Sequence, residues 1–191
     1  MKGRESGMPD ETWWASFFDV EGALNVLCGA ELPSGDVVEF GCGYGTFTVP
    51  VARRTTGIVT ALDIEEDMIA CVRQKSEEPG LHNIHVIQRD FIAEGSGVET
   101  GSQSHVMIYN LLHVENPLNL LREARRVLKT GGRLSVMHWR SDISTPRGPS
   151  LTIRPRPLQC RKWMTEVGFT NITSVDLQPF CPYHYGLTAI R

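Results

Sequence analysis

The sequence predicts a single α/β domain built on a doubly wound, seven-stranded and mostly parallel sheet. Three observations support this prediction. Five short apolar runs recur along the first 140 residues, helical patterns separate them, and two further strand-like runs near the end have no room for a helix between them. Strands that alternate with helices form parallel sheets through right-handed crossovers. The last two runs therefore add an antiparallel hairpin to that sheet.

Each expected strand is a short and continuously apolar run rather than a strictly alternating one. This pattern is typical of strands that are buried on both faces of a parallel sheet. The five parallel strands are expected at residues 36–40, 57–63, 83–90, 104–110 and 132–139, and the hairpin at 171–180 and 185–191.

Helices are expected in the intervals between these strands. The clearest covers residues 116–131, where Asn116 is the expected N-cap, Pro117 takes the first helical position and Gly131 closes the helix. Further helices are expected at 65–78, at 157–169 and over the aromatic-rich stretch 11–29. One more helix is expected directly after the glycine-rich loop.

Composition and length indicate one globular domain. The chain has 191 residues, of which 41% are hydrophobic, and a net charge of −3, which argues against general nucleic-acid binding. No apolar run approaches the roughly 18 residues of a membrane span. Five scattered cysteines without a CxxC pair indicate reduced thiols in a cytoplasmic protein and no zinc site. We divide residues 1–191 into an N-terminal lid or helical extension (1–35), a cofactor-binding core (36–140) and a substrate-side loop, helix and hairpin (141–191).

The stretch VVEFGCGYGTF, residues 37–47, carries the first functional signal. Its glycines, Gly41, Gly43 and Gly45, let the chain turn tightly and let a ligand approach the backbone. A dinucleotide fingerprint would place the third glycine one position later, at Thr46. Glu39 adds a negative charge that would repel a pyrophosphate and attract an ammonium or sulfonium group. An NAD-dependent oxidoreductase is therefore the alternative and not the first choice.

Acidic residues end the next two expected strands. Asp63 lies 22 residues after Gly41, a position from which a carboxylate can accept both ribose hydroxyls. Asp90 can accept an adenine amino hydrogen, while Ile64 and Phe91 offer apolar faces to the ring. Together with the glycine loop, these residues predict a positively charged adenosyl ligand without phosphate.

The stretches VVEFGCGYG, ALDIEEDMI, QRDF, MIYNLLHVENP and VLKTGGRLSV, in this order, resemble the motif series of class I S-adenosylmethionine-dependent methyltransferases. The small single-domain group that includes the ubiquinone/menaquinone-type enzymes is the nearest likeness. The resemblance implies a Rossmann-like sheet of order 3-2-1-4-5-7-6, S-adenosylmethionine as cofactor with S-adenosylhomocysteine as product, and a small-molecule acceptor. It implies cofactor contacts from Glu39, Phe40, Gly41, Cys42, Gly43, Tyr44, Asp63, Ile64, Met68, Asp90, Phe91 and Asn110.

Within that set, the resemblance implies a division of roles. Glu39, Gly41 and Gly43 would line the methionine end of the cofactor, and Asn110 would lie under the methionine moiety. Asp63 would hold the ribose and Asp90 the adenine amino group. No metal site is expected.

The acceptor side is less defined by the sequence. Methyl transfer needs alignment of the reacting atoms and exclusion of water, and it needs a base only if the nucleophile must lose a proton. His113 and His138 are candidate bases, with ordinary packing as the alternative for each. Arg140 begins the segment 140–162, which contains six Lys and Arg residues and one Asp. These basic side chains would receive an anionic group of the acceptor or form a solvated basic face.

Two further observations leave alternatives open. Trp13, Trp14, Phe17 and Phe18 would cover the cofactor as a lid or face the core of an amphipathic helix. The tetrapeptide YNLL at 109–112 differs from the Asn/Asp-Pro-Pro-aromatic pattern of enzymes that methylate planar nitrogens. A non-catalytic cofactor-binding or interaction domain stays as a second alternative, and the sequence leaves the acceptor atom and the oligomeric state undetermined.

Overall fold

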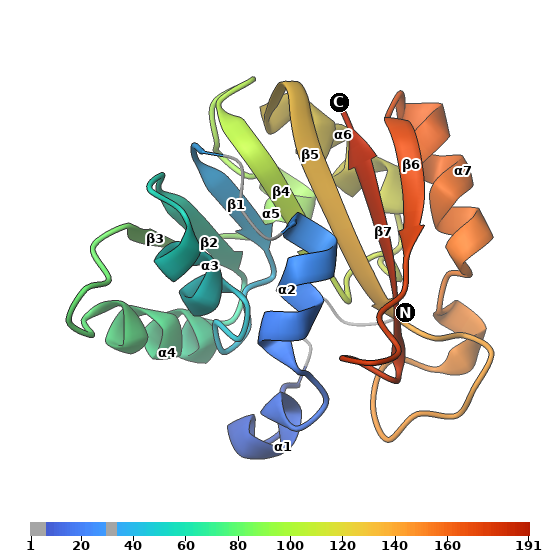
Figure 1. Ribbon diagram of the computed structural model, residues 1–191, viewed down its shortest axis with the longest axis horizontal. Helices are drawn as coiled ribbons and strands as arrows, with labels where there is room; N and C mark the ends of the chain where they lie inside the picture. Colours follow the sequence, from blue (N-terminus) through green and yellow to red (C-terminus); the bar gives the residue numbers. More distant parts are fainter. Residues whose placement is uncertain (1–6, 30–33) are drawn as a thin grey trace.

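A computed structural model of the chain describes residues 7–29 and 34–191. In this part of the chain, seven strands form one sheet in the order β3-β2-β1-β4-β5-β7-β6 (Figure 1). Neighbours among β1 to β5 pair in parallel, and β7 pairs antiparallel with β5 and β6. The strands are β1 (Val37–Phe40), β2 (Val59–Asp63), β3 (Ile84–Gln88), β4 (Gln103–Tyr109), β5 (Leu128–Trp139), β6 (Thr170–Val175) and β7 (His184–Ile190). The predicted order, including the C-terminal hairpin, is confirmed.

Helices cover both faces of the sheet (Figure 1). One layer contains α2 (Val20–Cys28), α3 (Thr48–Arg54) and α4 (Glu66–Ser76), and the other contains α5 (Phe91–Glu94), α6 (Pro117–Val127) and α7 (Pro157–Val167). Helix α1 (Glu11–Ala15) lies beyond the carboxyl edge of the parallel strands, and a 3-10 turn, η1 (Leu151–Ile153), precedes α7. None of the described helices has the length and apolar character needed to cross a bilayer.

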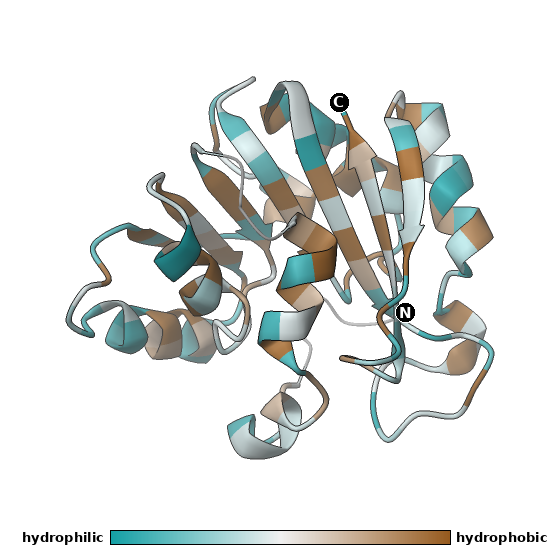
Figure 2. Cartoon of the chain, viewed as in Figure 1, coloured by the Kyte–Doolittle hydropathy of each residue, from teal (hydrophilic) through white to brown (hydrophobic). Residues whose placement is uncertain are grey.

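The core consists of two apolar layers separated by the sheet. On one face, Leu121 of α6 and Met164 of α7 belong to a buried cluster with Ile108 of β4. On the other face, Leu24 of α2 and Val51 of α3 pack with strand residues of β1 and β4. The central strands are therefore apolar along both faces, as Figure 2 shows, whereas the edge strands β3 and β6 are largely half-buried or exposed. This burial explains the continuous apolar runs in the sequence.

Two predicted helices have different boundaries. The helix expected at 116–131 ends at Val127, and β5 begins directly at Leu128, so that Gly131, with φ of 77°, lies within the irregular start of that strand. The single helix expected at 11–29 is divided into α1 and α2. Asp10 and Asp19 each accept a hydrogen bond from a backbone N–H three residues later, and each therefore starts its own helix.

Strand β6 and one short helix also differ from expectation. The strand expected at 171–180 ends at Val175, because the carbonyl of Leu177 accepts hydrogen bonds from the N–H groups of Phe180 and Cys181 and closes a turn. Helix α5 was not expected at all, since it contains only four residues. Of the expected N-terminal extension 1–35, residues 1–6 and 30–33 lie outside the described part of the chain.

Candidate functional site

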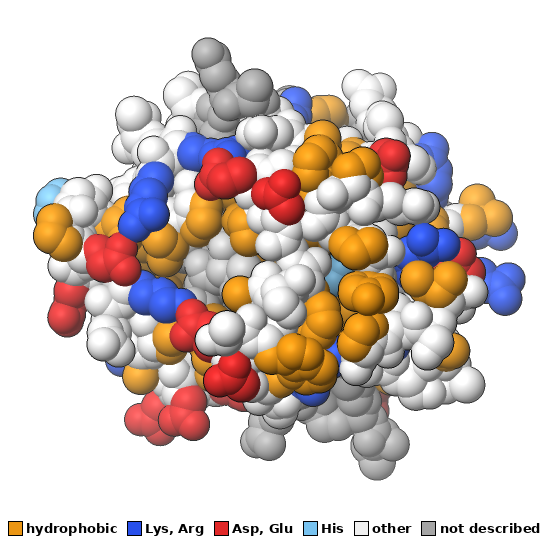
Figure 3. All heavy atoms as spheres, turned by 60° about the horizontal axis from the view of Figure 1, so that its bottom comes forward, with side chains coloured by type: hydrophobic (Ala, Val, Ile, Leu, Met, Phe, Trp, Pro, Cys, Tyr) orange, Lys and Arg blue, Asp and Glu red, His pale blue; other side chains and the backbone are white. Residues whose placement is uncertain are grey.

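A cleft of about 1240 Å³ lies at the carboxyl edge of the parallel strands. This edge is where open α/β sheets bind their ligands. The loops after β1, β2 and β4 line one side, and the segment 147–155, α7 and the N-terminal residues Met8 and Trp14 line the other. Figure 3 shows this end of the molecule, where hydrophobic side chains gather near the middle of the face and charged ones lie toward the rim.

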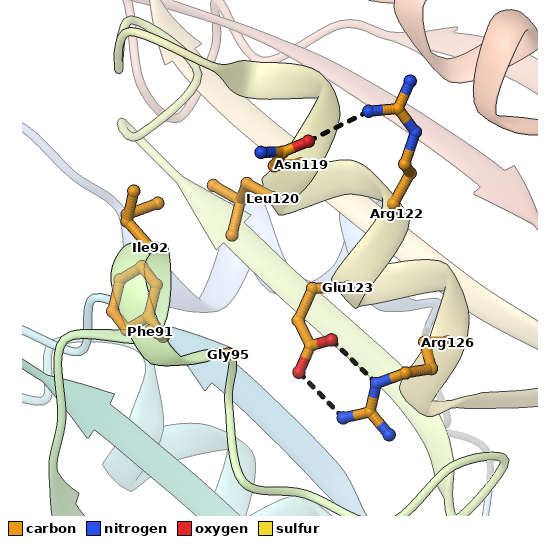
Figure 4. Close-up of a pocket in the computed structure, with 8 residues that line it drawn as sticks. All are labelled: Phe91, Ile92, Gly95, Asn119, Leu120, Arg122, Glu123 and Arg126. Atoms are coloured by element: carbon orange, nitrogen blue, oxygen red, sulfur yellow. Dashed lines mark hydrogen bonds and ion pairs between the residues drawn. The ribbon is translucent and has the colours of Figure 1, made fainter.

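A second cavity, of about 270 Å³, lies between α5 and α6 (Figure 4). Its charged groups already have partners: the Nε of Arg126 donates to Glu123 at 2.7 Å, and Arg122 donates to the side-chain oxygen of Asn119 at 2.9 Å. Hydrogen bonds from Arg126 and Ser96 lower the pKa of Glu123 to about 2. Because these charges are already paired, we place the functional site in the larger cleft.

The glycine loop turns sharply out of β1. Gly41, Gly43 and Gly45 have φ values of 73°, 51° and 73°, a left-handed region that favours glycine. The N–H groups of Gly41 and Cys42 both donate to the carbonyl of Leu62, at 2.8 and 2.9 Å, which ties the loop to the end of β2. Gly41, Cys42 and Gly43 consequently form the floor of the cleft with their backbone.

Asp63 stands at the end of β2, beside this loop, with 8% of its surface exposed. Its Oδ2 accepts from the N–H of Gly43 at 2.8 Å, and its Oδ1 accepts from the N–H of Glu65 at 3.0 Å. Burial raises its pKa, and these hydrogen bonds oppose that increase. Each carboxylate oxygen can accept a second hydrogen bond, so Asp63 has the geometry to hold a pair of adjacent hydroxyls.

Glu39 lies below the loop on β1 and lines the same cleft. It is 2% exposed and accepts a hydrogen bond from the hydroxyl of Thr48. Burial, together with repulsion from Asp63, raises the pKa of Glu39 to about 8. An ionised Glu39 was expected from the sequence. With this raised pKa, its carboxyl is mostly protonated at neutral pH unless a positive charge is bound beside it.

Asn110 follows β4 in a left-handed conformation, with φ of 58°. Its backbone N–H donates to the carbonyl of Met137 at 2.7 Å, and its amide nitrogen lies 3.4 Å from Nε2 of His184. Burial lowers the pKa of His184 to about 3, so this ring is neutral and accepts the amide hydrogen. The side-chain oxygen of Asn110 is then left buried and without a hydrogen-bond partner in the described structure. A ligand that donates a hydrogen bond would satisfy it.

The cleft brings together most of the residues predicted from sequence. Those that line it are Glu39, Gly41, Cys42, Gly43, Asp63, Ile64, Phe91, Asn110 and His113. His113 contacts His138 below the cleft lining, with its Nδ1 3.0 Å from Nε2 of His138. No group of three His, Cys, Asp or Glu side chains that could hold a metal occurs among residues 7–29 and 34–191.

The other predicted residues lie outside the cleft lining. Phe40 is fully buried against the ring of Phe91, and Met68 is buried in α4. The Tyr44 hydroxyl donates to the carbonyl of Pro9 at 2.6 Å. Asp90 accepts from the N–H of Ala93 at 3.0 Å and caps α5.

Of the basic segment 140–162, Arg147 and Arg154 line the cleft, whereas Arg140 does not. Arg140 forms an ion pair with Asp142 at 2.7 Å. Arg154 donates to the carbonyls of Pro149, Arg140 and Arg147, at 2.7, 2.8 and 3.2 Å, and so braces the loop that carries it. Its guanidinium carbon also lies 5.9 Å from the ring centre of Trp139.

Sequence reasoning missed several apolar side chains that line the cleft. They are Trp139, Pro149, Ile153, Pro155 and Trp163, together with Leu111 and Leu112 after β4. Most lie in a loop or on a helix that begins after the last parallel strand, where periodicity gives no information about which side chains face a cleft. Only for Trp139, at the end of β5, could the sequence have indicated that the side chain lines the cleft.

Known proteins share sequence and fold with this chain. The family model described as a methyltransferase domain matches residues 37–132, about half of the chain. A demethylmenaquinone methyltransferase of Listeria welshimeri is 32% identical over 121 residues, which cover 60% of this chain and 47% of that protein. A sarcosine/dimethylglycine N-methyltransferase of Halorhodospira halochloris is 29% identical over 164 residues, or 81% of this chain and 58% of that protein.

A solved structure shares the fold. The crystal structure of a SAM-dependent methyltransferase from Aquifex aeolicus superposes with a TM-score of 0.77 at 20% identity and covers 95% of this chain and 93% of that one. The fold and the cleft define a Rossmann-like class I methyltransferase domain, a class whose cofactor is S-adenosylmethionine. The chain belongs to the methyltransferase domain family, which confirms the resemblance seen in its motifs. It spans about half the length of the curated relatives it matches.

Proposed function

We propose that this chain binds S-adenosylmethionine in the large cleft and transfers its methyl group to a small-molecule acceptor. The observation that carries the proposal is the arrangement around the glycine loop. Two acids, Asp63 and Glu39, and the unpaired oxygen of Asn110 line the cleft together with the backbone of the glycine loop. This set suits a cation with a ribose diol and fits no pyrophosphate, so the oxidoreductase alternative is not favoured.

The residues of the cleft would bind the cofactor in three parts. Glu39, Gly41 and Asn110 would contact its methionine end, Asp63 would accept its two ribose hydroxyls, and the side chains of Ile64 and Phe91 would flank its adenine. When bound, the cofactor supplies an electrophilic methyl on a sulfonium. The protein's part is to orient this methyl toward the acceptor and to exclude water.

The acceptor would occupy the remaining, apolar part of the cleft. Trp139, Ile153 and Trp163 would contact its body. A negative group on the acceptor, which the basic segment led us to expect, would meet Arg147, the remaining arginine that lines the cleft beside Arg154. His113 is a titratable side chain of the cleft lining that could remove a proton from the acceptor.

Titration calorimetry with S-adenosylmethionine and S-adenosylhomocysteine tests the binding step. We expect binding by the wild-type chain and at least a tenfold loss of affinity in Asp63→Ala, because two hydroxyl hydrogen bonds to a carboxylate are lost. Asp67→Ala, which removes an exposed carboxylate from the first turn of α4, serves as the control and should bind normally. Failure of the folded wild-type protein to bind either compound would overturn the proposal.

A turnover assay tests the transfer step. Incubation with S-adenosylmethionine and a metabolite extract should yield S-adenosylhomocysteine and a product heavier by one methyl group in place of hydrogen. Mass spectrometry reads both. Binding without any such turnover would instead support the alternative of a non-catalytic cofactor-binding domain.

A further inference from the structure

Two histidines from different strand ends form a pair at the acceptor side of the cleft. His113 lies in the loop after β4 and lines the cleft, and His138 is fully buried on β5. Their rings meet at 73°, and Nδ1 of His113 lies 3.0 Å from Nε2 of His138. This distance is that of a normal hydrogen bond, so one of the two nitrogens carries a hydrogen and the other accepts it.

The other nitrogen of His138 decides the direction of this bond. Nδ1 of His138 lies 3.1 Å from the backbone carbonyl oxygen of Trp139. A carbonyl oxygen can only accept, so Nδ1 of His138 carries the hydrogen. In the neutral ring its Nε2 is then an acceptor, and the hydrogen between the two rings belongs to Nδ1 of His113. The neutral His113 ring therefore has its lone pair on Nε2.

We propose that His113 is the general base of this site, that it accepts a proton at Nε2, and that His138 is the positioning residue that sets its tautomer. This inference rests on the proposed methyl transfer. It restricts the acceptor to compounds whose nucleophilic group must lose a proton during the transfer, such as a hydroxyl or a protonated amine. A thiolate or a tertiary amine would need no such base.

The step balances for a hydroxyl acceptor. The oxygen forms a bond to the methyl carbon with one electron pair, and the carbon–sulfur bond breaks with its pair going to sulfur. The hydroxyl proton passes to Nε2 of His113. A sulfonium and a neutral imidazole become a neutral thioether and an imidazolium, so the net charge is conserved. The imidazolium keeps donating its Nδ1 hydrogen to His138, which holds the ring in place.

Titratable and charged groups lie on the elements around the pair. His184 and Tyr185 of β7 are the titratable groups on the strand next to His138, and Glu115 and Arg154 line the same cleft as His113. The pKa of His184 is lowered by burial and by the charge that His138 and Arg154 would carry. The pKa of Tyr185 is raised by its burial, so its ring is neutral. The Nε2 of His184 accepts from the amide of Asn110, and the Tyr185 hydroxyl donates to the carbonyl of Pro155.

Long-range ¹H–¹⁵N NMR of the labelled full chain tests the tautomers directly. At a pH where both rings are neutral, we expect His113 and His138 to carry hydrogen on Nδ1 and to show an unprotonated Nε2. His113→Gln and His138→Gln identify the two signals by their loss. A hydrogen on Nε2 of His113 in the wild-type protein would overturn the proposal. This readout needs neither cofactor nor acceptor, so it is independent of the proposed methyl transfer.

Kinetics with the acceptor found by the turnover assay provide the second test. We expect His113→Gln to lower kcat at least a hundredfold with little change in KM, and to remove the fall of the rate at acidic pH. His138→Gln can still accept the His113 hydrogen through its amide oxygen and should retain more activity than His138→Leu. His85→Gln, at an exposed site on β3, is the control. Wild-type rates in His113→Gln would overturn the assignment of the base while the methyl transfer itself stood.

Discussion

At the scale of single residues, the cleft is built from groups that are costly to place in a folded protein. Glu39 is a carboxyl buried beside a second carboxyl, Asp63, with one hydroxyl donor from Thr48. Asn110 adopts a left-handed backbone and keeps a buried oxygen without a partner. Each feature reduces the stability of the free protein, and a bound cation that donates hydrogen bonds would relieve both. This pattern is typical of a binding site rather than of core packing.

The pKa of Glu39 predicts a stability that depends on pH. The folded chain keeps this proton up to about pH 8, whereas the unfolded chain loses it near the ordinary value of 4.5. Between these values the folded state binds more protons, so this group lowers the free energy of unfolding as pH rises, by about 1.4 kcal/mol per pH unit. We expect Glu39→Gln to remove this contribution, so that its stability relative to wild type increases from pH 5 to pH 8. Urea unfolding at four pH values measures this difference. An equal pH dependence of both proteins would contradict the raised pKa of Glu39.

The glycine loop predicts a difference between two alanine substitutions. Gly41 and Gly80 both have positive φ, 73° and 89°, but a Cβ on Gly41 would lie 3.0 Å from Leu111, whereas a Cβ on Gly80 has no atom within 4 Å. Gly80→Ala should therefore cost only the backbone strain, about 1–2 kcal/mol. Gly41→Ala should cost more and also weaken S-adenosylmethionine binding. Urea unfolding and calorimetry measure the two effects, and equal losses in both variants would exclude the steric role of Gly41.

At the scale of elements, the strands and helices that depend on burial could be predicted from the sequence. The element boundaries that depend on single hydrogen bonds could not. The strands β1, β2 and β4 follow from continuous apolar runs, and Pro117 correctly indicated the start of α6. The early end of β6 and the division of the N-terminal helix depend on turn and cap contacts that have no periodic pattern. For the same reason, the strand ends predicted many of the residues that line the cleft, whereas the part of the lining built by a long loop could not be predicted.

Helix α5 provides a prediction at this scale, because its cap residue was expected to bind adenine. Asp90 accepts from the N–H of Ala93, so Asp90→Ala should destabilise the protein by about 1 kcal/mol, whereas Asp90→Asn can still cap and should cost less. If Asp90 also contacts the adenine amino group, both variants should lose affinity for S-adenosylhomocysteine. Calorimetry and thermal unfolding separate the two roles. Normal affinity in the Asn variant would restrict Asp90 to capping.

At the scale of the whole molecule, the cleft lies between a rigid sheet edge and a thin cover. Residues 7–15 cross the glycine loop. Contacts that involve side chains hold them there. The Nε1 of Trp14 donates to Thr46 at 3.1 Å, Lys75 pairs with Glu11, and Arg147 donates to the carbonyl of Gly7 at 2.5 Å. Helix α1 itself has no buried residue. We expect a segment held in this way to open at a low free-energy cost and to admit the cofactor.

The last prediction follows from this cover. Backbone amides of α1 should exchange with solvent rapidly in the free protein and more slowly with S-adenosylhomocysteine, because Met8 and Trp14 line the cleft and would contact the bound compound. Lys75→Met removes both the ion pair with Glu11 and a 2.7 Å hydrogen bond to the carbonyl of Tyr44. We expect it to speed exchange in α1 by about fivefold, as a loss of ~1 kcal/mol would.

Hydrogen exchange read by mass spectrometry measures these changes, with Lys129→Met as a control at an exposed site on β5. Exchange in α3 and α6 should stay the same in both variants, because neither substitution touches those helices. If α1 exchanged at one rate in all three proteins and with or without the bound compound, the N-terminal segment would be a static part of the wall. Entry to the cleft would then depend on the loop braced by Arg154, whose three carbonyl bonds would have to open instead.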